Sequence, residues 1–449
     1  MRLISLERLL DRILRFRARA IAIGEQLVLS VANFVMVLAA GRLMHGDAFA
    51  SLGVALSATV VLQGVHRTVI TIPFVVETAP QGRLEHEGRA WLQLSLFTAT
   101  AFGLVGALIG LICLVIHQPL WMSEALLASG PYTIVTCMFE FTRRWMFQER
   151  AYLRMLIMST EISAIQIACL FVLASLNALT PTLSLVAMSI ATAIGVVVVF
   201  IPRWARLDRV SGQFRAIAIR QVHFGKWSAL GTLAYNGYNN MIPILLGFFS
   251  GAPVVAAFSA SRQLMQPVLI PLMAVNNVDK QRSSQEFAAG GLPRLKASLF
   301  RTGLLLFSLC AIYAVAAVVL GPMTMDLMFR GKYHAGPLVF ALWGLVFIFT
   351  AVVQPLETSM YVLRQAHATF YAKLMGGAVA IAAVALLSAR FGAGGAVAAA
   401  AIGWAVTFVA SWIAVTRRWA RMEAEAPEDT PSAEAMAADQ TAGTASAQV

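Results

Sequence analysis

Residues 91–116 read WLQLSLFTATAFGLVGALIGLICLVI, a run without a single charged side chain. A helix needs roughly 20 apolar residues to cross the hydrocarbon core of a bilayer, which is about 30 Å thick. This run is therefore long enough to span a membrane, and comparable runs recur along the chain. The predicted spans are 21–41, 48–72, 91–116, 121–145, 155–176, 182–201, 227–249, 254–277, 300–320, 337–362, 367–388 and 393–415.

The composition of the whole chain agrees with a membrane protein. Of its 449 residues, 59% are hydrophobic and 12% are charged, and the mean hydropathy is +0.74. A soluble domain cannot bury that much apolar surface, so the excess must face lipid. The four cysteines lie inside apolar runs and form no CxxC pair. We therefore expect no disulfide, no bound metal and no cofactor.

Basic residues set the expected orientation of the helices. The net charge is +12 and the pI is about 10.1, values also found in nucleic-acid-binding proteins. Here, however, 28 of the 34 Lys and Arg residues lie on one side of the predicted helices, including both ends of the chain. Lys and Arg accumulate in cytoplasmic loops, so both termini are predicted to be cytoplasmic. These cations are expected to contact anionic membrane lipids, without a nucleic-acid partner.

Changes in composition divide the chain into five parts. They are a basic amphipathic N-terminal helix at 1–19, an N-lobe of helices one to six at 20–202, a cytoplasmic linker helix at 203–224, a C-lobe of helices seven to twelve at 225–416, and a disordered cytoplasmic tail at 417–449. The lobes share a weak repeat, in which Gly24 and Asn33 correspond to Gly225 and Asn236. Transporters are often built from two related halves. The sequence thus predicts an all-α polytopic membrane protein with twelve transmembrane helices.

Several short stretches resemble a known family. They are Gly225-Lys226-Trp227, the Asn-rich segment that follows, the turn at 247–251, Ala256-Ala257-Phe258-Ser259-Ala260, the opening segment 25–52, and Phe139-Glu140-Phe141-Thr142-Arg143-Arg144. Together with the hydropathy layout over roughly residues 20–415, they resemble the polysaccharide-export branch of the MOP exporter superfamily. This resemblance implies a MATE-like fold, with two six-helix lobes around a V-shaped central cavity.

The resemblance also implies a function. Wzx-type flippases of this branch move undecaprenyl-diphosphate-linked oligosaccharides from the cytoplasmic to the periplasmic leaflet of the bacterial inner membrane. They do so by alternating access, for surface polysaccharide biosynthesis, and relatives flip the peptidoglycan precursor or export drugs. The expected substrate is a lipid-linked oligosaccharide, the expected partners include other polysaccharide assembly proteins, and no enzymatic activity is expected.

Two arginines inside predicted spans are candidates for contact with such a substrate. Ionisable groups in a membrane are costly and are therefore functional candidates by default. Arg262 lies nine residues after Pro253, about 13 Å along a helix and near the midplane. Its planar guanidinium suits phosphate oxygens, although a structural pair with an acid of another helix is the alternative. Arg67, beside Gln63 and His66, is nearer the cytoplasmic end of the second helix.

Amide and aromatic side chains form the second group of candidates. Helix seven carries Tyr235, Asn236, Asn239 and Asn240, and Asn236 and Asn240 lie one turn apart on one face. Such a stripe suits sugar hydroxyls, and Asn33 at the matching depth of helix one adds a facing amide. Hydrogen bonding between helices explains the same stripe equally well.

Acidic residues and one histidine are candidates for ion coupling. Glu161 and Glu357 lie deeper in their helices than the other acids, and each would couple to proton movement if burial raised its pKa. A salt bridge at the edge of the cavity is the alternative for both, and a buried hydrogen bond is the alternative for His66. Glu140 is expected to pair with Arg143 and Arg144 at i,i+3 and i,i+4 spacing.

Three other functions remain open. A MATE-type ion-coupled antiporter of drugs or metabolites would be expected to carry a carboxylate deep in the first helix, where this chain has only Glu25, near the start of that span. A membrane polysaccharide polymerase or ligase would be expected to have a large periplasmic loop, and the largest loop here, about 321–336, is small. A scaffold without transport activity is the third.

The predicted orientation can be tested by cysteine labelling in intact cells. His334→Cys should react with a membrane-impermeant maleimide from the periplasm, whereas Gly212→Cys should react only after the inner membrane is permeabilised. The reason is the asymmetry of Lys and Arg. The reverse pattern of labelling would overturn the topology.

Overall fold

The computed structural model describes residues 2–78, 83–204, 213–363 and 365–425 and is helical almost throughout. The first half of the chain forms one group of antiparallel helices. Its elements are α1 (Arg2–Leu43), α2 (Gly46–His66), the π turn η1 (Arg67–Thr71), α3 (Ile72–Glu77), α4 (Arg83–Val115), α5 (Leu120–Gln148), α6 (Tyr152–Ser175) and α7 (Pro181–Trp204).

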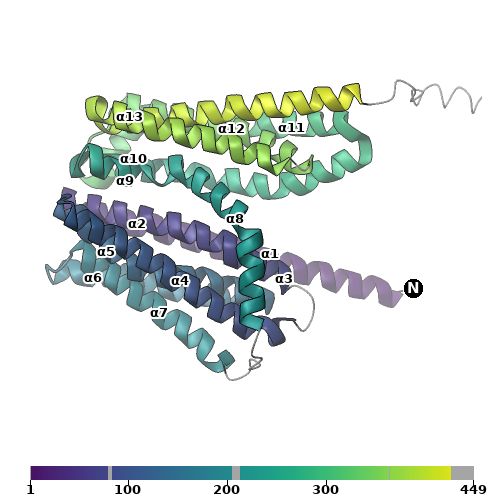
Figure 1. Ribbon diagram of the computed structural model, residues 1–449, viewed down its shortest axis with the longest axis horizontal. Helices are drawn as coiled ribbons and strands as arrows, with labels where there is room; N and C mark the ends of the chain where they lie inside the picture. Colours follow the sequence, from purple (N-terminus) through teal and green to yellow (C-terminus); the bar gives the residue numbers. More distant parts are fainter. Residues whose placement is uncertain (1, 79–82, 205–212, 364, 426–449) are drawn as a thin grey trace, which may run out of the picture.

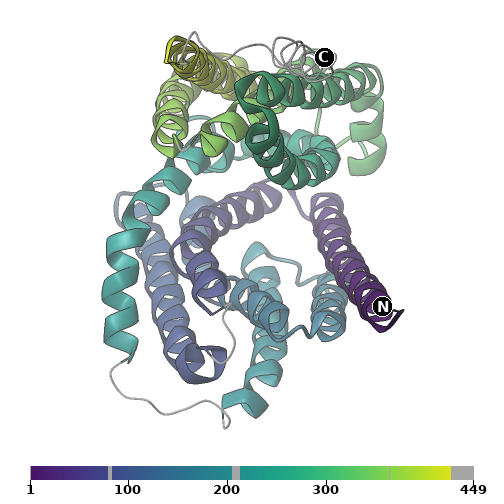
Figure 2. The ribbon, with the colours of Figure 1, turned by 90° about the vertical axis from the view of Figure 1, so that its right-hand side faces the viewer.

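The second half of the chain forms a second group of helices. Its elements are α8 (Gln213–Asn239), α9 (Ile242–Phe249), α10 (Ala252–Met265), the 3-10 turn η2 (Gln266–Val268), α11 (Leu269–Phe329), α12 (Pro337–Val362) and α13 (Ala366–Ala424). Figures 1 and 2 show α1–α7 as one lobe and α9–α13 with the C-terminal part of α8 as the other. The N-terminal part of α8 crosses from the first lobe to the second.

Glycines fold the two longest helices, α11 and α13, back on themselves. Gly291 (φ 63°, ψ −154°) and Gly392 (φ 55°, ψ −133°) adopt backbone angles that residues with a Cβ atom avoid. The two arms of each bent helix then run antiparallel and form a helical hairpin. Across the α11 hairpin, the Thr302 hydroxyl donates to Asp279 Oδ1 at 2.6 Å. In the second hairpin, Gly376 and Gly403 allow the two arms to approach closely.

With α11 and α13 divided at these glycines, η1 and α3 joined to α2, α9 joined to α8, and η2 joined to the helices on both its sides, the described residues form twelve helical segments. Counted without these divisions, eight helices of the described residues are long and apolar enough to cross a membrane, and two of the eight run through the bends at Gly291 and Gly392. Large apolar side chains on the outer surface, such as Phe97, Leu104 and Leu386, are well over half exposed, as lipid-facing residues are. An all-α polytopic membrane protein is thus confirmed, with a helix count consistent with the prediction.

The boundaries of the predicted parts differ from the observed helices. The linker helix predicted at 203–224 and helix seven belong to a single helix from residue 213, and residues 205–212 lie outside the described part. α13 continues to Ala424, so residues 417–424 are helical although the tail was predicted to begin at 417, and 426–449 lie outside the described residues. α1 begins at Arg2, but the side chains on which the amphipathic prediction for 1–19 rests are not described.

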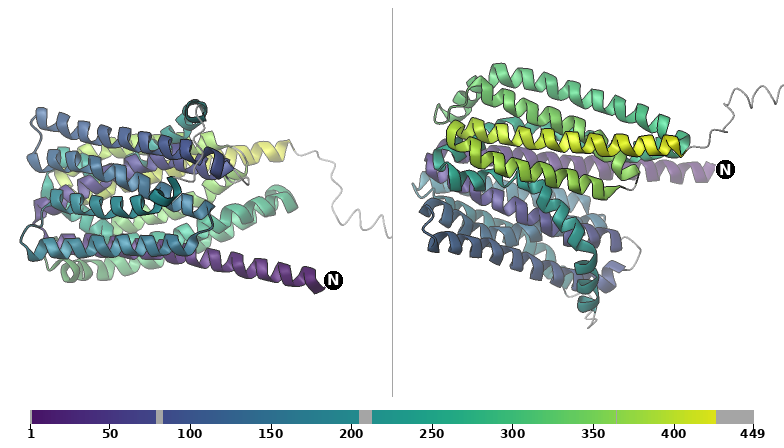
Figure 3. Two further views of the ribbon diagram at one scale, coloured as in Figure 1. Left: turned by 90° about the horizontal axis from the view of Figure 1, so that it is seen from below. Right: turned by 45° about the horizontal axis from the view of Figure 1, so that its top comes forward.

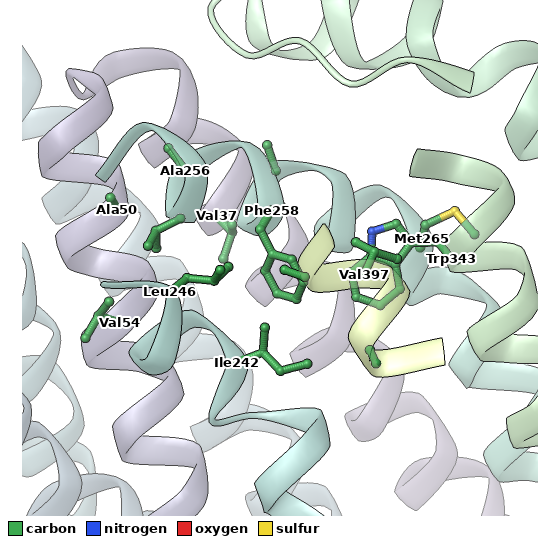
Figure 4. Packing of buried hydrophobic residues seen from close by; sticks show 14 of the residues in the cluster. Val37, Ala50, Val54, Ile242, Leu246, Ala256, Phe258, Met265, Trp343 and Val397 are labelled. Carbon is green, nitrogen blue, oxygen red and sulfur yellow. The ribbon is translucent and has the colours of Figure 1, made fainter. Parts of the chain in front are cut away.

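Both ends of the described chain lie at one end of the helical bundle, which we call the terminal end (Figures 1 and 3). The opposite, far end contains the turns at 44–46 and 330–336. The lobes pack together in a shared apolar core (Figure 4). In that core Val37, Ala50 and Val54 of the first lobe lie near Ile242, Leu246 and Ala256 of the second.

Polar contacts join the two lobes at the far end. Arg42 donates to the carbonyl oxygens of Met328 and Leu327, the second at 2.9 Å, and Lys332 donates to the carbonyl oxygens of Arg42 and Met44. These groups form an interlobe latch, with Arg42 on one lobe and Lys332 on the other.

An aromatic cluster lies beneath the interlobe latch. Phe49 of the first lobe lies 5.3 Å from Tyr333 and 6.2 Å from Phe329, measured between ring centroids. Burial raises the pKa of Tyr333 to about 12, so the phenol keeps the proton that it donates to Gly41 O at 3.3 Å. The latch and these rings together close the far end.

Removing the interlobe latch should open the far end. The combined Arg42→Ala and Lys332→Ala variant loses charge-assisted hydrogen bonds worth about 1.5–3 kcal/mol each. A reporter cysteine at Thr350, which lines the cavity described below, should then react on the order of tenfold faster with an impermeant maleimide added on the far side. The four native cysteines are replaced in this background. Arg390→Ala, at the same end on α13, is the control and should leave the labelling rate unchanged. A latch variant that is labelled at the wild-type rate would contradict the assignment of these contacts as a latch.

Candidate functional site

A cavity of about 890 Å³ lies between the two lobes. The first lobe contributes the end of α2 and the π turn, with Gly64, Arg67 and Thr68. The second contributes residues from every element from α8 to α13. Of the residues predicted to contact substrate, Arg262, Arg67, Tyr235, Asn236, Asn239 and Asn240 all line this cavity.

Arg262 is held by a chain of amide side chains. Its Nη2 donates to Asn240 Oδ1 at 2.7 Å, and Asn240 Nδ2 donates to Asn236 Oδ1 at 2.6 Å. Asn236 Nδ2 in turn donates to Thr232 O at 2.9 Å. Asn236 and Asn240 can meet because residues four apart lie on one face of a helix. The chain orients the guanidinium without neutralising it, because every partner in it is uncharged.

Arg67 occupies the opposite wall of the cavity, on the first lobe. It begins the π turn η1, and such single-turn bulges occur often at functional sites. The next residue, Thr68, lies 2.8 Å from Thr232 of α8, hydroxyl to hydroxyl. The π turn therefore brings Arg67 to the cavity at a point where the two lobes touch.

Lys373 of α13 is a third cation of the cavity, and sequence reasoning missed it. Its position near Arg364 made it look like one of the loop cations. Its Nζ lies 2.9 Å from Glu357 Oε1 of α12 and 4.9 Å from the centre of the Tyr235 ring. Glu357 was a candidate either for proton coupling or for a salt bridge at the edge of the cavity, and the structure shows the salt bridge.

The remaining lining is aromatic, hydroxylic or apolar. Among the described residues that line the cavity there is no Asp or Glu, whereas Arg67, Arg262 and Lys373 are cations. The aromatic side chains of this lining all belong to the second lobe, and they are Tyr235, Trp343, Phe347, Tyr361, Phe370, Tyr371 and Trp404. Cations of this kind bind phosphate oxygens, and aromatic faces with amides bind sugars. The cavity is therefore suited to an anion that carries polar, ring-shaped groups.

Asn33 and Gln63 do not line the interlobe cavity. They line a second cavity of about 300 Å³ inside the first lobe, together with Glu140, Arg143 and Gln166. Gln63 donates there to Thr136 O at 3.2 Å. The expectation that Asn33 faces the amides of helix seven therefore does not match the structure, because depth along a helix does not determine the direction in which a side chain points.

His66 and Glu161 lie outside both cavities. His66 is fully buried, with Nε2 3.3 Å from Ser95 O, which is the buried hydrogen bond considered as its alternative. Glu161 is an exposed residue of α6. Neither is placed to exchange a proton with a molecule in the interlobe cavity.

Two buried acids of the first lobe, Glu25 and Glu140, meet in an ionic cluster. Arg143 donates to both carboxylate oxygens of Glu25, at 2.5 and 2.6 Å, and to Glu140 Oε2 at 2.6 Å. Ser159 donates to Glu25 Oε1 at 2.8 Å, and Arg144 reaches Glu140 at 3.3 Å. The predicted pairing of Glu140 with both arginines is confirmed. The contact with Glu25, 118 residues away, had no signal in the sequence.

Solved structures of similar fold exist, although no protein-family model and no curated protein matches this sequence. The lipid II flippase MurJ in an inward closed conformation is 10% identical, covers 87% of this chain and 86% of its own, and has a TM-score of 0.68. A multidrug resistance MATE family transporter of the MOP superfamily, in an inward-facing conformation, is 13% identical over 89% of this chain and 96% of its own, with a TM-score of 0.64.

An outward-facing multidrug resistance MATE family transporter of the same superfamily is 11% identical, covers 91% of this chain and 96% of its own, and has a TM-score of 0.58. At these identities the similarity shows the fold alone. The chain thus has the fold of MOP-superfamily transporters, as the sequence resemblance implied. That fold is shared by proteins that carry lipid II and by proteins that confer multidrug resistance.

The ionic cluster makes a prediction about stability that compares two neighbouring arginines. Arg143→Ala should lower the free energy of unfolding by about 3–5 kcal/mol, because it leaves Glu25 and Glu140 buried without their main partner. Arg144→Ala removes a longer contact from a side chain that is 44% exposed, so solvent screening should keep the loss below about 1 kcal/mol. Unfolding by SDS in mixed micelles measures both, and equal losses would contradict the assigned role of Arg143.

Proposed function

We propose that this protein is a flippase for polyprenyl-diphosphate-linked oligosaccharides in surface polysaccharide biosynthesis. It would move them by alternating access from the cytoplasmic to the periplasmic leaflet of a bacterial inner membrane. The observation that carries this proposal is the charge of the interlobe cavity: three cations and, among its described lining residues, no acid. A diphosphate needs such cations to replace the water that it loses.

The shape of the molecule supports alternating access. The interlobe latch and the aromatic cluster close the far end, while the cavity lining extends to Tyr361 and His367 beside the α12–α13 connection at the terminal end. Both of these side chains are exposed. With the termini in the cytoplasm, as the arginines predict, this conformation would receive substrate from the cytoplasmic leaflet.

The aromatic and amide groups support a substrate that also carries sugars. Tyr361 and Tyr371 line the cavity with exposed rings of the kind that stack on sugar rings, and Asn239 adds donors and acceptors. The lipid chain needs no site in the cavity, because it can remain in the bilayer beside the lobes. Other polysaccharide assembly proteins remain partners expected from the resemblance.

Export of cationic drugs is disfavoured by the same charges. A cation entering the cavity would meet Arg67, Arg262 and Lys373, and like charges repel strongly in a partly dehydrated site. The carboxylates of the first lobe that could compensate, Glu25 and Glu140, are already bound to Arg143. We therefore propose a lipid-linked anion rather than a cationic drug as substrate.

Flipping by the purified full chain in liposomes tests the proposal. Wild-type protein should translocate a fluorescent polyprenyl-diphosphate-linked oligosaccharide. Arg262→Ala should translocate it more slowly at low substrate concentration, because it loses charge-assisted contacts worth about 1.5–3 kcal/mol, which lowers affinity on the order of tenfold to a hundredfold. Arg301→Ala, on α11 and exposed outside the cavity, is the control and should behave as wild type. Efflux of a cationic dye without flipping of the lipid would instead identify a drug transporter.

A further inference from the structure

The three cations of the cavity have different surroundings. Arg262 is hydrogen-bonded to the neutral amide of Asn240. Lys373 instead lies between the carboxylate of Glu357 and the face of the Tyr235 ring, at 2.9 and 4.9 Å. Three helices, α12, α8 and α13 itself, thus meet at one ammonium group. Among the described residues, Lys373 is the one cation of the three with a carboxylate at ion-pair distance, whereas Arg67 feels the charge of Glu140 only over a longer distance.

Glu357 approaches Lys373 from outside the cavity. Lys373 and Tyr235 are among the lining residues, whereas Glu357 is not. Both side chains of the pair are largely buried, at 15 and 17% exposure. An ion pair with this little water is screened less than a surface pair. The carboxylate therefore reduces the positive potential of Lys373 without presenting its own charge to the cavity.

We propose that Glu357 is the counter-ion that sets how tightly the cavity holds a phosphate oxyanion at Lys373. This inference rests on the proposed function and adds a residue that determines affinity. An incoming diphosphate and the Glu357 carboxylate compete for the same ammonium. A flippase must release its substrate on the other side of the membrane, and an internal competitor keeps the anion from being held too tightly.

Binding of geranylgeranyl diphosphate to the purified full chain in detergent tests the competition. Glu357→Gln keeps the shape of the side chain but removes its charge, so affinity should rise on the order of threefold to tenfold. Lys373→Gln should lower affinity by about tenfold. In the flipping assay, Glu357→Gln should bind more tightly but turn over more slowly.

Three further variants separate competition from a structural role. Removing the carboxylate in the double variant Glu357→Gln, Lys373→Gln should raise affinity, relative to Lys373→Gln, by much less than Glu357→Gln raises it relative to wild type, because most of the competition is for the ammonium. Glu357→Asp, which restores the charge, should return affinity toward the wild-type value. Glu423→Gln is the matched control: Glu423 pairs with Lys296 at 2.6 Å, also between α13 and a neighbouring helix, but outside the cavity. It should bind like wild type.

Each outcome has a distinct meaning. If wild-type protein binds the diphosphate but Glu357→Gln binds it equally or more weakly, Glu357 merely supports the fold around Lys373, and this inference fails while the proposed function stands. If wild-type protein binds no geranylgeranyl diphosphate, the proposed substrate class and this inference fail together. A parallel titration with inorganic pyrophosphate separates the sources: stronger binding of the lipid supports a lipid-linked substrate, and equal binding would indicate a site for free diphosphate.

Discussion

The guanidinium of Arg262 between two helical lobes is the constraint on which the rest of the structure depends. A charge between membrane-spanning helices is tolerated only if polar groups surround it and water can reach it. The chain from Arg262 through Asn240 to Asn236 supplies the polar groups, and the separation of the lobes supplies the space. The Arg262 guanidinium therefore needs the cavity, because the cavity gives water access to the charge.

The placement of the acidic residues keeps the charge of the interlobe cavity positive. In the first lobe, Glu25 and Glu140 are bound by Arg143 and are not part of the lining of the interlobe cavity. In the second, Glu357 reaches Lys373 from outside the lining. Negative charge is thus neutralised where the helices pack. The net positive potential remains facing the cavity, as the proposed anionic substrate requires.

The candidate site was predictable where a single helix determines it. Asn236 and Asn240 lie four residues apart, so their common face follows from helical geometry, and Arg262 stood out as a charge within an apolar run. Lys373 was missed because its neighbours in sequence are loop cations, and only the packing of α13 against α12 and α8 brings it to the cavity. Asn33 was assigned to the wrong cavity because sequence specifies its depth but not the rotation of its helix.

The sequence by itself determined the membrane class and the all-helical architecture, because the length and hydropathy of a segment are local properties. The number of spans and the side of the membrane that carries the cations are predictions of the same local kind. Only the tertiary structure decided which faces of these helices meet. Glu25 and Arg143 are 118 residues apart, and Arg42 and Lys332 are 290 apart. Such pairs depend on how each helix is rotated and tilted against its neighbours. In an almost uniformly apolar chain, packing between helices sets that rotation, and no pattern within a single helix records it.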